Sequence, residues 1–388
     1  MTILLERQSV VGAKVEATEG VAEVLAAADA AVLPYEAKFQ PDVSLYKRTP
    51  HRGSLTPLAG IPGRYLGKIA FKSEFKGSGA VATPPEWDAY IRGCGYARSA
   101  VSTIAIGAIT GGPFQAGETI TGGTSGATGR VVGDHATGVA AVRYVVLSGA
   151  FTSGETLTGG TSTATATTSG TPTAAQGYEY RPSSTTQVSL TMALWQDGIR
   201  HSLVGCRGTF KMTHKVGEPV VFEWEFTGAW TGTTDEAASS LGTIPYQEID
   251  PAAWRNVSFL AGTYAAVIES LSVDAGNDLV PRPSANAATG IASVLLPGRA
   301  PTAEIDPEMV LVADHDFLGR LRAGTVGRLA YGFGSGTGQR LTFGAPRAQY
   351  SSVDLQARLQ GVVTARVPMD LVATTIVGGD DEIQIGMF

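Results

Sequence analysis

Hydrophobic and polar positions alternate most regularly in residues 188–228. Apolar side chains occupy every second position, the period of a strand with one buried face, in three segments: residues 188–194, 209–215 and 222–226. Asp197-Gly198 favours a tight hairpin turn between the first two segments. Gly217-Glu218-Pro219 turns the chain before the third. The pattern predicts an antiparallel meander with one apolar face and one charged face.

One helix stands out against this β pattern, over residues 83–95. Thr83 is a candidate N-cap, and Pro84 and Pro85 suit the first turn. Apolar residues then follow at helical spacing: Trp87, Tyr90, Ile91 and Cys94. This stripe predicts a helix that packs against the sheet of the first half.

Residues 101–176 differ from their surroundings because they carry almost no charge and contain an internal repeat. FQAGETITGGTSGATG begins at Phe114, and FTSGETLTGGTSTATA begins at Phe151, an offset of 37 residues (114 to 151). A repeat of this kind predicts two copies of one small β unit. We interpret the segment as an insertion, which serves either as a spacer or as a contact with a host surface or a neighbouring ring.

The C-terminal half repeats the order of the N-terminal half: a strand, a Pro-Glu helix start, a glycine hairpin and further strands. Residues 70–75 and Pro85-Glu86 have possible counterparts in residues 293–296 and Pro307-Glu308, with Asp306 as a cap. We therefore predict a duplication. The Ala-rich residues 22–32 also favour a helix.

The motifs in these segments resemble one known family. They are the DG hairpin, G-x-x-G-T-F, G-E-P and the aromatic strand ending in F-T-G, then G-S-G-x-x-x-T-P-P-E-W, S-L-S-V-D-x-G-N, G-R-x-P-T and G-D-D-E-I-Q-I. Together they resemble the major tail tube proteins of long-tailed, siphovirus-like bacteriophages, over most of residues 35–100 and 178–388. The resemblance implies a mainly β protein with tandem antiparallel β-sandwich or barrel domains, each with a flanking helix, plus a small β insertion.

The resemblance also implies a division of the chain. Residues 1–44 are expected to form an N-terminal arm with a helix. The first tube domain combines residues 45–100 and 177–250, the inserted repeat occupies residues 101–176, and the second tube domain covers residues 251–388.

Function follows from the same resemblance. Such a protein is a structural subunit and not an enzyme, located in the virion tail and, before assembly, in the host cytoplasm. Its expected partners are other copies of itself, in stacked rings of three or six chains, and the tail terminator, tape-measure and baseplate proteins. DNA passes through without specific binding. Alternatives are a baseplate or adhesin protein that binds host glycans, or a β-rich depolymerase.

Charge fits a conduit better than a nucleic-acid binder. The net charge is −6, and only 16% of residues are charged, whereas tight DNA binding needs clustered Lys and Arg. Glu223 and Glu225 share the polar face of an aromatic strand, so we expect both to be candidate lumen-facing residues. Lys211 and Lys215 on the neighbouring strand are possible partners, which would give these glutamates a structural role.

No catalytic, cofactor or metal site is predicted. The five histidines lack metal-ligand spacing, and the glycine loop 334–338 precedes a strand instead of a helix. The acidic run 379–382 is better explained as a solvated turn than as a calcium site. Cys94 and Cys206 suit buried thiols. No run of about 18 apolar residues is present, so no membrane insertion is expected.

Overall fold

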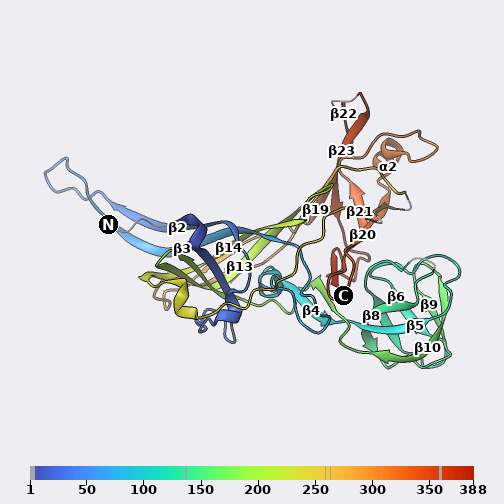
Figure 1. Ribbon diagram of the computed structural model, residues 1–388. Coiled ribbons are helices and arrows are strands. Elements are labelled where there is room, and N and C mark those ends of the chain that lie inside the picture. Colours follow the sequence, from blue (N-terminus) through green and yellow to red (C-terminus); the bar gives the residue numbers. More distant parts are fainter. Residues whose placement is uncertain (1–4, 136–137, 258, 263, 358–360) are drawn as a thin grey trace.

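The computed structural model describes residues 5–135, 138–257, 259–262, 264–357 and 361–388 (Figure 1). Strands account for 49% of the chain and helices for 6%, which confirms the predicted mainly β fold. The helical elements are short: η1 (Glu6–Gln8), η2 (Ala27–Ala30), α1 (Asp88–Gly93), η3 (Ala238–Leu241) and α2 (Phe317–Ala323). Among the described residues, no helix has the length and apolar character needed to cross a membrane.

Sixteen of the described strands are linked into one antiparallel sheet network. Its main path runs through β2 (Tyr35–Arg48), β3 (Leu58–Glu74), β14 (Val221–Asp235), β13 (Ile199–Lys215), β16 (Ser270–Asp274), β19 (Thr302–Ile305), β23 (Val363–Leu371), β21 (Leu341–Tyr350), β24 (Gln384–Met387), β11 (Tyr178–Pro182) and β4 (Tyr96–Ala100). Side branches add β1 (Ser9–Val15), β12 (Leu190–Gln196), β15 (Leu260–Ala261), β20 (Val326–Phe333) and β22 (Asp354–Ala357).

The two halves of the chain repeat one topology. In the first half, the hairpin β2–β3 precedes α1 and the hairpin β13–β14, and the strand order is β2-β3-β14-β13. In the second half, β16 and β19 precede α2, and the order is β16-β19-β23-β22, with β22 continuing from the end of β21. If the four strands of each half are numbered along the chain, they lie side by side in the sheet in the order first, second, fourth, third in both halves. Since β13 pairs with β16, the two sets join edge to edge into eight neighbouring strands.

Each half also begins with a long hairpin. Residues 35–74 form the first. Residues 270–305 form the second, because β16 and β19 continue through the bridge between Asn277 and Arg299 into β17 (Val280–Pro283) and β18 (Ile291–Leu295). The counterpart of β3 is therefore β19. The predicted match of residues 70–75 to residues 293–296 is wrong, because residues 293–296 lie in the outer part of the second hairpin.

Three predicted helix starts need correction. Helix α1 begins at Asp88 with Trp87 as its N-cap residue, not at Thr83, because consecutive prolines hold the residues before them in extended backbone. Asp306 does not begin a helix. Its carboxylate accepts hydrogen bonds from the backbone N–H groups of Glu269 and Ser270, and α2 starts later, at the N-cap Asp316. The Ala-rich residues 22–32 contain only the single turn η2.

The main core lies on the apolar face of the meander and extends through both halves of the chain. The predicted helix stripe packs into it, since all four of its members are at most 2% exposed: Trp87, Tyr90, Ile91 and Cys94. Aromatic side chains from the strands surround Trp87, with ring centroids 5.5 Å away for Phe75, 4.9 Å for Tyr180 and 5.6 Å for Phe222. One sheet and one core thus connect the two halves.

The repeat segment forms a closed barrel of six strands. They are β5 (Ser102–Ile106), β6 (Thr119–Gly122), β7 (Thr128–Val131), β8 (Ala141–Ser148), β9 (Thr156–Gly159) and β10 (Thr165–Thr173). Thr121 of the first copy lies directly opposite the equivalent Thr158 of the second, so an approximate twofold axis passes between them. The copies are interleaved, because β7 pairs with β8 and β10 pairs with β5. They share a separate apolar core.

The barrel contacts the large sheet through polar side chains that are mostly buried. Arg130 of β7 forms an ion pair with Glu179 of β11, whose side chain is 1% exposed. Gln384 of β24 donates to both the Glu179 carboxylate (2.6 Å) and the backbone oxygen of Val131 (2.9 Å). Arg328 adds an ion pair to Asp134 at 2.7 Å. The insertion therefore neutralises a carboxylate of the main body and is not a freely hanging appendage.

We expect deletion of the barrel to leave a folded but less stable protein. Ala100 and Tyr178 are direct partners across β4 and β11, so a short linker can join them as a hairpin. The deletion removes Arg130, the ion-pair partner of Glu179, together with the barrel atoms beside that carboxylate, so the loss should stay below the cost of about 3–5 kcal/mol for a buried pair that is broken in place. Adding Glu179→Gln should restore part of this loss in a urea melt. An insoluble deletion variant that Glu179→Gln does not improve would contradict this interpretation.

Candidate functional site

The eight neighbouring strands present one polar face to the surface. Its side chains form rows that run across the strands, because paired residues on one face lie opposite each other. One row follows directly from the pairing of β3, β14, β13, β16, β19 and β23: Lys72, Glu223, Lys211, Asp274, Thr302 and Asp370. Positive and negative charges alternate over the first four positions of this row.

Both predicted lumen residues lie on this face. Glu223 lies between Lys72 and Lys211 in register, and Glu225 forms an ion pair with Lys68 at 2.7 Å. Of the two lysines on β13 expected as partners, Lys211 lies opposite Glu223 in register. Lys215 does not, and it pairs with Glu218 in the following turn at 2.7 Å.

The face is not basic. Carboxylates outnumber cations on it, the cations being Lys38, Lys68, Lys72, Lys211, Lys215 and Arg366, and the carboxylates Glu36, Asp42, Glu74, Glu223, Glu225, Asp274, Glu304, Asp354 and Asp370. Several of them are paired with one another, including Lys72 with Glu36 at 3.1 Å and Arg366 with Glu304 at 2.7 Å. The Arg366 guanidinium lowers the pKa of Glu304. A shallow hollow of about 310 Å³ lies over part of this face, and the charged residues that line it are Glu36, Lys38, Lys72, Lys211, Glu223, Glu225 and Asp274.

We expect single substitutions on this face to change stability little. Glu225 is about half exposed, and exposed ion pairs contribute roughly 0–1 kcal/mol. Glu225→Gln should therefore shift the free energy of unfolding by less than about 1 kcal/mol. Lys68→Gln is the matched variant on the other side of the pair. A loss several times larger in chemical denaturation would show that the pair holds the sheet together.

One end of the polar face is covered by the outer part of the second hairpin. Ile291 of β18 packs on Leu66, Val204 and Ala229, which come from β3, β13 and β14, and all four side chains are buried. The Arg207 guanidinium donates to the backbone oxygen of Val294 and to Glu19 of the N-terminal arm. An arm of the second half is thus fixed onto the first half.

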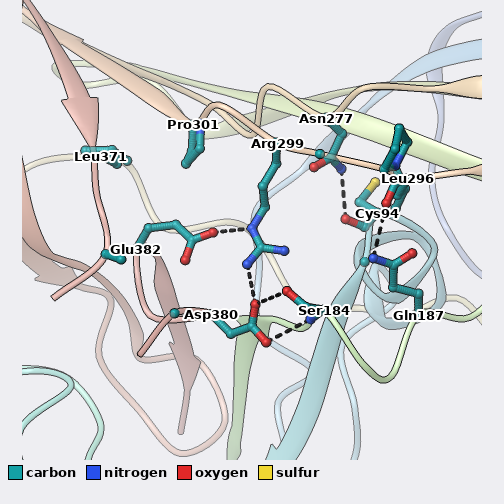
Figure 2. Close-up of a pocket in the computed structure, with 15 residues that line it drawn as sticks. Cys94, Ser184, Gln187, Asn277, Leu296, Arg299, Pro301, Leu371, Asp380 and Glu382 are labelled. Carbon is teal, nitrogen blue, oxygen red and sulfur yellow. Dashed lines mark hydrogen bonds and ion pairs between the residues drawn. The ribbon is translucent and has the colours of Figure 1, made fainter. Parts of the chain in front are cut away.

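A deeper pocket lies elsewhere, where the loop after α1 meets the second half (Figure 2). Its volume is about 440 Å³. Arg299 extends between Glu382 and Asp380 and pairs with both, and Ser184 donates to Asp380 through its hydroxyl (2.6 Å) and its backbone N–H (2.8 Å). Burial opposes ionisation of Asp380, but the bonds from Ser184 and Arg299 outweigh it and lower its pKa. The acidic run thus serves an internal ion-pair network.

His135, His214 and both cysteines are buried in the interior. Burial lowers the pKa of His135 and His214 to about 3, so both are neutral near pH 7. His214 contacts the backbone oxygen of Leu271 and the Tyr331 hydroxyl. Cys94 and Cys206 are buried free thiols whose pKa is raised by burial. Within the described residues, no group of three or more His, Cys, Asp or Glu is placed to hold a metal ion.

Comparisons with known protein families and with curated proteins do not identify a family for this chain. No protein-family model and no curated protein matches the chain. Among the described residues, three features bear on function: the doubled strand order, the polar face and the open outer edges of β2 and β22.

Proposed function

We propose that this protein is the structural subunit of a bacteriophage tail tube and that three chains close into one ring. The observation that carries the proposal is the doubled strand order in a single sheet. The β13–β16 pairing joins the last strand of the first set to the first strand of the second set. A ring of three chains would then hold six quasi-equivalent sets, which favours three chains over six.

The outer edges of the eight strands provide the means of closure. At one end, β2 pairs only with β3, and at the other end, β22 pairs only with β23, within the part of the chain that the structure describes. Such open edges are templates for pairing with another chain. We propose that β22 of one copy pairs with β2 of the next, as β13 pairs with β16 inside the chain.

The expected dimensions suit a DNA conduit. Eight strands from each of three chains, spaced about 4.8 Å apart and tilted by about 40°, give a barrel with a backbone diameter of about 48 Å. The polar face would line it, including Glu223 and Glu225. Because carboxylates outnumber cations there, the wall would offer few unpaired positive charges to phosphate, so DNA would pass without tight binding.

Electron microscopy of the purified protein tests this function. Rings or striated tubes in negative-stain images, formed at high protein concentration, are the expected result. A protein that sediments only as a monomer at such concentrations, with no rings in the images, would contradict the proposal. Because the barrel of residues 102–173 is outside the eight strands, the barrel-deleted variant should form rings too.

A second candidate function is host attachment through glycans, and one observation favours it. The barrel displays a row of directly opposed threonines on β7, β6, β9 and β10: Thr128, Thr121, Thr158 and Thr165. Their hydroxyls can donate and accept hydrogen bonds without carrying charge, and the hydroxyls of a neutral sugar can do the same. Discrete trimers without tubes, together with binding to a neutral-glycan array that Thr121→Val and Thr158→Val abolish, would favour this function.

A further inference from the structure

The first long hairpin, residues 35–74, leaves its outer part uncovered. Four of its apolar side chains are strongly exposed: Leu45 at 64%, Tyr46 at 71%, Leu55 at 106% and Ile61 at 47%. In Figure 1 the β2–β3 hairpin projects away from the rest of the molecule. Several large apolar residues gathered on a projecting arm indicate an interaction surface.

The second long hairpin, residues 270–305, shows how such an arm is covered. Its outer strand β18 lies on the sheet of the preceding strand set and packs against β3, β13 and β14. The contact is closely fitted, since Tyr65 donates its backbone N–H to the backbone oxygen of Thr289 at 2.9 Å. A Cβ on Gly205 would lie 2.8 Å from the Cα of Ser293.

We infer that the β2–β3 hairpin docks onto the second half of a neighbouring copy, in the way that the β17–β18 arm docks onto the first half of its own chain. The two hairpins occupy equivalent places in the two strand sets. The set that precedes β16 belongs to the same chain, whereas the set that would precede β2 in a closed ring belongs to another chain. The inference rests on the proposed ring.

The same equivalence indicates the receiving surface. Ala229, which receives Ile291, lies in β14 beyond the position of Glu223. The counterpart of β14 is β23, and the equivalent stretch is the segment just after Leu371. This segment contains Ile376 and Val377, which are 104% and 99% exposed. The exposed apolar side chains of the β2–β3 hairpin and those of the segment after Leu371 thus lie on the two sides of one predicted contact.

Chemical cross-linking of the full-length protein tests this pairing. In the Leu45→Cys, Val377→Cys double variant, a flexible bis-maleimide should link neighbouring copies, and denaturing gels should show linked species that end at three chains. The native thiols Cys94 and Cys206 are buried and should remain unlinked. The matched control is Leu45→Cys with Val146→Cys, because Val146 is also exposed (49%) but lies on the barrel strand β8.

The outcomes separate the two proposals. The docking is supported if the micrographs show rings, if the Leu45→Cys, Val377→Cys pair links at most three chains, and if the control pair links little. Rings without linkage of the first pair, or with equal linkage of both pairs, overturn the docking and leave the ring intact. An absence of rings under reducing conditions, for the parent as well as the variant, contradicts the proposed function itself.

Discussion

Trp87→Ala should lower the free energy of unfolding by about 3–5 kcal/mol, the usual cost of removing a large buried aromatic side chain. Trp87 is fully buried, and its indole N–H donates to the backbone oxygen of Lys76 at 2.8 Å. It packs on Phe75, Tyr180 and Phe222. The substitution thus opens a cavity where α1 meets the sheet. Urea denaturation followed by circular dichroism measures the change.

Trp87→Phe is the matched control. It keeps most of the apolar volume and loses the hydrogen bond to Lys76, so a cost of about 1 kcal/mol is expected. A Trp87→Ala protein that unfolds at the same urea concentration as its parent would mean that the helix does not pack on the sheet in solution. Equal losses for both variants would instead assign the effect to the hydrogen bond.

The Glu118→Ala, Glu155→Ala double variant should lose the barrel. Each glutamate accepts hydrogen bonds from the turn of the other repeat: Glu118 from the backbone N–H groups of Thr161 and Ser162 at 3.1 and 2.9 Å, and Glu155 from those of Thr124 and Ser125 at 3.2 and 2.9 Å. Both side chains are at most 5% exposed. Removing both carboxylates deletes these part-buried hydrogen bonds to a charged acceptor, each worth about 1.5–3 kcal/mol. Hydrogen exchange at β6 and β9 should rise to the level of an unfolded segment.

The pH dependence of the barrel gives an independent measure. Burial raises the pKa of Glu155, but the bonds from Ser125, Thr152 and Thr124 outweigh it and lower the pKa to about 2, from 4.5 in the unfolded chain. A lowered pKa stabilises the fold above about pH 4.5, and this contribution is lost as the pH falls towards 2. The stability difference between the parent and Glu155→Gln should therefore narrow over this range. A difference that is constant from pH 6 to pH 2 would show that the charge contributes nothing.

Much of the strand pattern was predictable from the sequence because burial on one face imposes a period of two. The segments 188–194, 209–215 and 222–226 all lie within strands β12, β13 and β14, except for positions at their edges. Glu223 and Glu225 were placed on the polar face for the same reason. Which lysine faces which glutamate depends on register between strands, and register is fixed by contacts far apart in the sequence. This is why Lys68 was not predicted as the partner of Glu225.

Helix starts and the duplicated order were harder to predict. Asp306 has the residue type and spacing of a helix N-cap, but its carboxylate does not cap a helix. It accepts hydrogen bonds from two backbone N–H groups at the start of β16 instead. The second hairpin contains the turn at Gly276-Asn277 in its interior, since the strands continue beyond it to β17 and β18. A local turn signal does not show whether two strands pair again further along. The correspondence between β3 and β19 therefore became visible only in the pairing of strands.

Of the barrel, the sequence predicts two β units but not how they combine. The repeat G-E-T-[IL]-T-G-G-T-S marks the glutamates at positions 118 and 155 as equivalent. It does not reveal that each one stabilises the turn of the other copy. Such an exchange requires the copies to interleave, which depends on barrel closure. The available signal was a glutamate that recurs close to a Gly-Gly turn in both copies, within a segment that carries few charges.

The mass of the assembled ring tests the central claim most directly. Mass photometry of rings, dissociated from any tubes and kept at neutral pH, should give a species of three chains, each of 40.2 kDa, because each chain supplies two strand sets to a sixfold arrangement. A ring of six chains would contradict the claim that the two sets within one chain occupy equivalent places in the wall. A single 40.2 kDa species at every concentration at which the protein remains in solution would contradict the conduit altogether.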